Sequence, residues 1–118
     1  MPTAQLELSP ATPLFTVRAG HPNIELMVRH LAGLDWQTSN EILSALNQPI
    51  TEHNRRWLRA LANASGGRVA GGQRGYKLIE EMSRAEYDHW RNWMTSQADQ
   101  MRRRVIEADR TWFARKPL

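Results

Sequence analysis

A chain of 118 residues with 41% hydrophobic and 24% charged side chains has enough material for one domain with a modest core and some appendages. The absence of cysteine excludes disulfides, thiolate metal sites and cysteine nucleophiles, and it fits a reducing cytoplasm. The net charge of +4 is uneven, since residues 1–50 hold two basic and four acidic side chains and residues 51–118 hold 14 basic and eight acidic ones.

Residues 53–79 carry six basic side chains and no acid. Such a segment indicates an anionic partner, of which nucleic acid is the commonest. A solvated face with incidental charge is the alternative interpretation.

Residues 1–22 hold four of the six prolines and little helical periodicity, which predicts an extended arm. Neither a signal peptide nor a membrane span is expected, because no basic leader is present and no apolar run approaches about 18 residues. Within the arm, Gln5–Leu8 resembles short peptides that dock on the bacterial sliding clamp, although Ser9 replaces the usual aromatic residue. The other interpretation is an arm that packs on the core or on a neighbouring subunit.

Two short helices are predicted next. Asn23 is a favourable N-cap, and apolar residues follow it at helical spacing: Ile24, Met27, Val28 and Leu31. Gly33 would end this helix. Thr38–Glu41 has the pattern of a capping box, and the helix that it starts ends before Pro49. Its apolar residues are Ile42, Leu43 and Leu46.

A third helix is predicted from Glu52 to about Ala64, with Thr51 as its cap. Its inner side carries Asn54, Leu58, Leu61 and Ala62, with Trp57 at the flank. Its outer side carries Glu52, Arg56, Arg59 and Asn63, with His53 and Arg55 on the shoulders. A short helix, a turn of about four residues and a helix with a basic outer side is the plan of a helix-turn-helix, whose second helix enters the major groove.

Residues 66–79, with the sequence GGRVAGGQRGYKLI, predict a β-hairpin. Residues 68–70 and 76–79 are β-prone, and residues 71–75 form a loose tip in which the glycines supply positive φ. A phosphate-binding loop is excluded by spacing, because no G-x-x-x-x-G-K-[ST] motif occurs. The hairpin is interpreted as a wing that contacts DNA, with a purely structural hairpin as the alternative.

Ser83–Glu86 forms a second capping-box pattern, and no helix breaker follows until Pro117. This predicts a helix of about 30 residues, roughly 45 Å long. An apolar stripe along it predicts pairing with another helix, and hence a homodimer. The residues assigned to oligomerisation are Tyr87, Met94, Ala98, Met101, Val105, Ala108 and Trp112. Arg102–Arg104 fans over about 200° of the helix, so at most two of these arginines could reach one duplex.

From Trp36 to Phe113 the order of elements and the segment SGGRVAGGQRGYKL resemble small phage and prophage winged helix-turn-helix DNA-binding proteins. In that family a G-Y-x-L strand closes the wing and a long arginine-rich helix follows. The resemblance implies a DNA-binding module for transcriptional control, replication or excision, located at the nucleoid of a bacterial host. It places the basic contacts at Arg55, Arg56, Arg59, Arg68 and Arg74. Trp57 departs from the family pattern, which has a small or aliphatic residue there.

The predicted fold is therefore mainly α with a small β-hairpin: an arm at residues 1–22, a winged helix-turn-helix at 23–82 and a long C-terminal helix at 83–116. The expected function is sequence-selective binding of double-stranded DNA, with bases read by Arg56, Arg59 and Asn63. The full set of residues expected at DNA is Thr51, His53, Arg55, Arg56, Arg59, Asn63, Arg68, Gln73, Arg74 and Lys77.

Two other classes of function stay open. The winged fold could serve a protein–protein accessory factor in replication or recombination, recruited through the arm, or an inhibitor whose basic face occupies the acidic groove of a nucleic-acid enzyme. No enzyme activity, cofactor or metal is expected, because no nucleophile stands in a catalytic pattern and the four histidines lack ligand spacing: His21, His30, His53 and His89.

Overall fold

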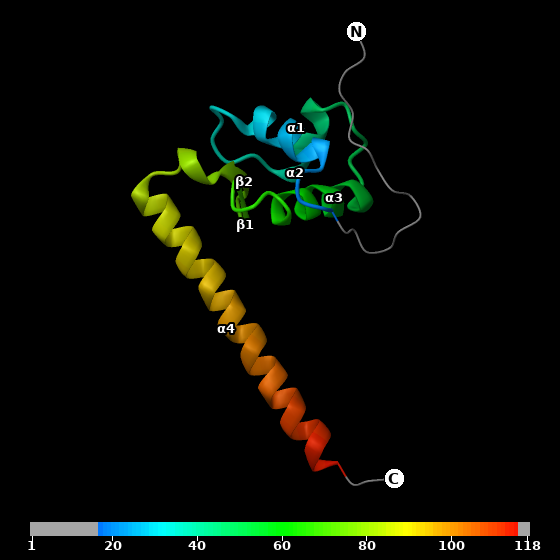
Figure 1. Ribbon diagram of the computed structural model, residues 1–118, viewed down its shortest axis with the longest axis vertical. Helices are drawn as coiled ribbons and strands as arrows, with labels where there is room; N and C mark the ends of the chain where they lie inside the picture. Colours follow the sequence, from blue (N-terminus) through cyan, green and yellow to red (C-terminus); the bar gives the residue numbers. More distant parts are fainter. Residues whose placement is uncertain (1–16, 116–118) are drawn as a thin grey trace. The chain divides into compact units, whose positions relative to one another are not determined.

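The computed structural model describes residues 17–115 (Figure 1). The predicted arm up to residue 16, with its Gln5–Leu8 motif, lies outside the described residues. The described elements are α1 (Pro22–Leu31), α2 (Ser39–Ala45), α3 (Glu52–Asn63), β1 (Val69–Gly72), β2 (Gly75–Leu78), a 3-10 turn at Ile79–Glu81 and α4 (Arg84–Ala114). The mainly helical class with a two-stranded antiparallel sheet is confirmed. The chain divides into two units, residues 1–82 and 83–118.

The start of α1 differs from the prediction. His21, and not Asn23, is the N-cap, and its Nδ1 accepts a hydrogen bond of 3.1 Å from the backbone N–H of Asn23. Pro22 occupies the first helical position, where the backbone N–H that proline lacks would have no partner within the helix. Gly33 follows the C-cap residue with a φ of +76°, as its predicted role at the helix end requires.

Local hydrogen bonds cap the starts of α2 and α3, and Asn47 turns the chain between the two helices. The predicted capping box of α2 is present, with Thr38 and Glu41 each capping the other. Asn47 has a φ of +55°, which turns the chain out of α2. At the start of α3, the hydroxyl of Thr51 accepts from the N–H of Asn54, whose buried side-chain amide donates to the carbonyl of Pro49 at 2.8 Å. These bonds set the angle at which α3 leaves the turn.

One hydrophobic core joins α1, α2, α3 and the hairpin. The predicted inner side of α3 is buried, and Trp57 is buried with it. The core consists of Ile24, Met27, Val28, Leu31, Ile42, Leu43, Leu46, Trp57, Leu58, Leu61, Ala62, Val69, Tyr76 and Leu78. A fully buried leucine contributes about 2 kcal/mol, so the inner side of α3 holds the helix while its outer side stays available.

The hairpin is tighter than predicted. β1 and β2 pair from Val69 with Leu78 to Gly72 with Gly75, so Gln73 and Arg74 alone form the turn. The prediction of a loose tip at residues 71–75 was wrong, because the glycines on both sides of the turn join the strands. An isolated bridge also joins Gln37 to Tyr76 through hydrogen bonds of 2.9 and 2.8 Å between their backbones. The connection between α1 and α2 is thereby attached to β2.

Ser65 links the end of α3 to the start of the hairpin. Its buried hydroxyl donates to the carbonyl of Ala62 at 2.7 Å and accepts from the N–H of Val69 at 3.1 Å. We expect Ser65→Ala to lower the free energy of unfolding by about 1–2 kcal/mol, because the buried Val69 amide loses its partner. Urea denaturation measures the loss. Ser44→Ala, on the exposed side of α2, is the control and should change stability by less than about 0.5 kcal/mol; equal losses would contradict the bridging role of Ser65.

The second unit contains α4, which has 31 residues and spans about 46 Å. Its predicted capping box is present, since Ser83 and Glu86 cap each other. None of the described residues of α4 is buried, and the apolar stripe of its C-terminal half is exposed.

Candidate nucleic-acid interface

The outer side of α3 presents a row of polar and basic side chains. Glu52, Arg56, Arg59 and Asn63 are exposed, whereas His53 and Arg55 are half-buried at its edges. This division follows from helical periodicity, because the residues between them fill the core. The structure therefore brings together on α3 five of the residues expected at DNA (His53, Arg55, Arg56, Arg59 and Asn63), next to the capping residue Thr51.

Short contacts order these side chains before any ligand binds. One carboxylate, that of Glu52, lies 3.3 Å from Nε of Arg56 and 3.7 Å from Nη1 of Arg55. Nε of Arg55 also donates to the Asn40 side chain on α2 at 3.1 Å. Because exposed ion pairs of this kind contribute only about 0.2–1 kcal/mol, a phosphate can take the place of the carboxylate at little cost.

Arg59 connects α3 with the hairpin. Burial raises the pKa of the Tyr76 phenol on β2, and the charge of the Arg59 guanidinium and its hydrogen bond to the phenol partly offset that effect. Arg59 therefore lies against the strand that follows the hairpin turn. Gln73 and Arg74 are exposed in that turn, and among the described residues no ion pair involves Arg74.

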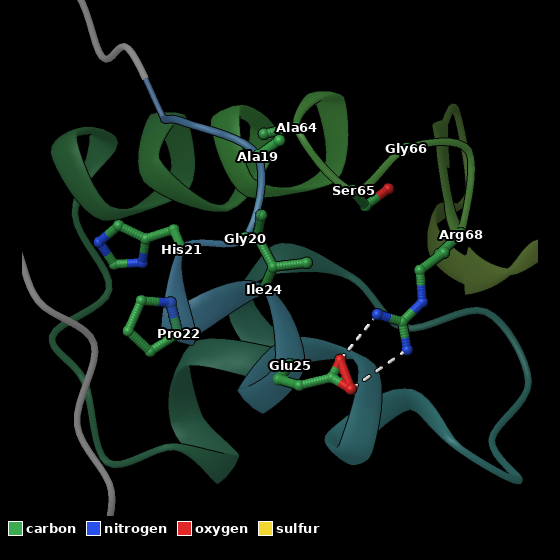
Figure 2. Close-up of a pocket in the computed structure, with 10 residues that line it drawn as sticks. All are labelled: Ala19, Gly20, His21, Pro22, Ile24, Glu25, Ala64, Ser65, Gly66 and Arg68. Atoms are coloured by element: carbon green, nitrogen blue, oxygen red, sulfur yellow. Dashed lines mark hydrogen bonds and ion pairs between the residues drawn. The ribbon is translucent and has the colours of Figure 1, made fainter.

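Arg68 belongs to a different surface. Figure 2 shows its side chain pointing toward Glu25 of α1, with Nη1 2.7 Å from the carboxylate. This hydrogen bond is the largest cause of the lowered pKa of Glu25 and of the raised pKa of Arg68. The pair borders a pocket of about 300 Å³ between residues 19–25 and the loop after α3. The guanidinium of Arg68 thus already forms an ion pair with a carboxylate on α1.

The structure also places Lys77 differently from the expectation that it follows a phosphate. Lys77 is only 8% exposed, and its Nζ lies 3.2 Å from the carboxylate of Asp35 in the connection between α1 and α2. A buried ammonium group in an ion pair has little surface to offer a phosphate, so Lys77 is not part of the interface that we propose below. Arg68 is left out as well, because its guanidinium contacts Glu25 of α1.

Sequence reasoning missed three residues that position the basic side chains: Gln37, Asn40 and Tyr76. Gln37 pairs with β2, Asn40 holds Arg55, and Tyr76 contacts Arg59. Only Tyr76 carried a signal, as an aromatic residue in a β-prone run. The one-residue bridge of Gln37 and the single side-chain contact of Asn40 leave no periodic pattern in the sequence, so neither could be predicted from it.

Among residues 17–115, no group of three or more acidic or histidine side chains is arranged to hold a metal ion. The same part of the chain contains no helix with the length and apolarity that a bilayer crossing requires. No protein-family model, curated protein or solved structure matches the chain.

Proposed function

We propose that residues 23–82 form a winged helix-turn-helix that binds double-stranded DNA in a sequence-selective manner. The observation that carries the proposal is the outer side of α3, where Arg56, Arg59 and Asn63 are exposed together while the inner side anchors the helix in the core. The short helix, fixed turn and basic helix follow the helix-turn-helix order. A hairpin directly after them, with Arg74 exposed at its turn, corresponds to a wing.

In this mechanism α3 enters the major groove and reads base edges. An arginine can grip guanine through O6 and N7, and an asparagine can grip adenine through N6 and N7, which suits Arg56, Arg59 and Asn63. Arg55 and Thr51 near the start of α3 then bind phosphate, since helix N-termini attract anions. The role of His53 is a secondary contact at the same end of the helix. Gln73 and Arg74 reach the flanking backbone.

The biological setting that we propose follows the resemblance to small phage and prophage regulators. Control of transcription or replication of a mobile element in a bacterial host would place the protein at the nucleoid. Selection from random duplexes identifies the target: enrichment of one motif supports sequence-selective binding. Failure to enrich any duplex favours the accessory-factor or inhibitor alternatives.

Salt dependence tests the electrostatic part of the proposal. Four cations per protomer stand at the proposed interface: Arg55, Arg56, Arg59 and Arg74. In the mechanism above Arg55 and Arg74 bind phosphates while Arg56 and Arg59 read bases, so the slope of log K against log salt is about −1.8 per protomer, and affinity falls about 12-fold between about 50 and 200 mM salt. Fluorescence anisotropy of a labelled duplex measures the slope. A slope near zero would rule out backbone contacts by these residues.

A further inference from the structure

An uncovered apolar seam runs along the C-terminal half of α4. We define the α4 seam as Met94, Ala98, Met101, Val105, Ala108 and Trp112. Successive members of this set are separated alternately by four and by three residues. At about 100° per residue they fall within about 80° of the helix circumference. The exposed fractions are 44% for Met94, 63% for Met101, 59% for Val105 and 56% for Trp112. Because the α4 seam has heptad spacing and is exposed, it is suited to pack against one other helix.

The charges beside the seam identify which helix this is. With Ala98 and Val105 at heptad position a, and Met94 and Met101 at d, Arg104 takes position g and Asp109 takes position e. Neither of these two residues has an ion pair within the described protomer.

In a parallel pair each g residue faces the e residue five positions later in the other helix. Arg104 of each copy then faces Asp109 of the other copy, so two opposite-charge pairs form by symmetry. The adjacent g-to-e pair, Gln97 with Arg102, brings no like charges together.

An antiparallel pair is disfavoured by the same charges. The register that overlaps the whole α4 seam places Trp112 over Met94 and Ala98 over Ala108. It also makes e face e and g face g, so that Arg102 meets Arg102 and Arg104 meets Arg104 of the other copy. Two like-charge contacts replace two attractive ones.

Antiparallel registers shifted by one heptad are also poor. A shift toward the N-terminus sets Asp88 against Asp109 twice, once toward each end of the side where e faces e. A shift toward the C-terminus leaves Met94 facing a point beyond the end of α4 at Ala114. Each of these antiparallel registers therefore either brings like charges together or shortens the overlap of the two seams.

We infer that α4 pairs in parallel with a second copy of this chain through the α4 seam, with Arg104 and Asp109 joined across the two helices. The pair brings both copies of Ser83 to the same end. The pairing itself does not depend on DNA binding. Its functional consequence rests on the proposed function: two winged units linked at one end would bind two half-sites with the avidity of a tethered pair.

Cysteine cross-linking of the full chain tests the orientation, because the protein has no cysteine of its own. In the parallel pair, Ala108→Cys faces its own counterpart and should form an intermolecular disulfide in most molecules under mild oxidation. In the fully overlapped antiparallel pair the two sulfurs would be about 15 Å apart along the helices, too far for a disulfide. Ser96→Cys, on the side of α4 opposite the seam, is the control and should not cross-link.

Light scattering of the unoxidised protein without DNA completes this test. A dimer that cross-links through Ala108→Cys supports the inference. A dimer that fails to cross-link there is antiparallel, and a monomer at tens of micromolar has no pairing, so either result overturns it. Both measurements omit DNA, so a parallel dimer that binds no duplex would overturn the proposed function alone.

Charge exchange tests the pairing of Arg104 with Asp109. Arg104→Glu and Asp109→Lys should each raise the dimer dissociation constant about 10-fold, because two attractions become two repulsions. The double variant should restore it to within about threefold of the original. Arg103→Glu, on the outer side of α4, should leave it unchanged. If the double variant did not recover affinity, the proposed contact between Arg104 and Asp109 would be contradicted.

Discussion

Reversal of two charges on α3, in Arg56→Glu/Arg59→Glu, is expected to abolish specific duplex binding, with a loss of affinity of about 1000-fold or more. Each arginine that grips a base contributes about 1–3 kcal/mol, and each glutamate adds repulsion from the phosphates. Both side chains are exposed and outside the core, so the variant should remain folded. Anisotropy at fixed salt measures binding, and circular dichroism with thermal denaturation checks the fold.

A matched control separates the position of the charges from their number. Arg18→Glu/Arg29→Glu makes the same change in net charge at two exposed residues before α2, one of them on α1. This control should lose no more than about 10-fold in affinity, since distant charges are screened within about 10 Å. Equal binding by the two double variants would show that α3 is not the interface. A nuclease-resistant pull-down of a protein partner would then support the accessory-factor or inhibitor alternative.

The sequence predicted the helices well because the signals for helices are local. The capping boxes of α2 and α4 and the Thr51 cap lie within four residues of the helices that they start, and all three are present. The inner side of α3 likewise follows from spacing along twelve residues. His21 displaced Asn23 as the cap of α1 because Pro22 can serve as the first helical residue, a local effect that apolar periodicity does not record.

The sequence could not place residues whose surroundings depend on a distant partner. Charge patterning groups Lys77 with the arginines, but its environment is decided by Asp35, 42 residues away, in the connection that pairs with β2. Arg68 is likewise held by Glu25, 43 residues away. The composition of residues 53–79 thus identified a basic segment correctly but could not tell which of its cations face one surface.

Gly75→Ala is expected to lower the stability of the first unit strongly. Gly75 has a φ of +106°, and a Cβ there would lie 2.1 Å from the carbonyl oxygen of Gln37 and 2.9 Å from Cα of Thr38. Both neighbours are backbone atoms, so the Gln37–Thr38 segment must move away from β2. This movement breaks the two hydrogen bonds between Gln37 and Tyr76 and disturbs the cap of α2. A loss of about 3–5 kcal/mol follows, which is a large part of a typical domain stability.

Gly67→Ala is the control that separates the close approach from backbone strain. Gly67 also has a positive φ, +83°, but no atom lies within 4 Å of the position that its Cβ would take. Its substitution should therefore cost only the strain of a left-handed alanine, about 1–2 kcal/mol. Denaturation by urea measures both losses, and equal losses would contradict the tight attachment of Gln37 to β2. A larger loss for Gly75→Ala would show that the close approach of the Gln37–Thr38 segment to Gly75 stabilises the hairpin that carries Arg74.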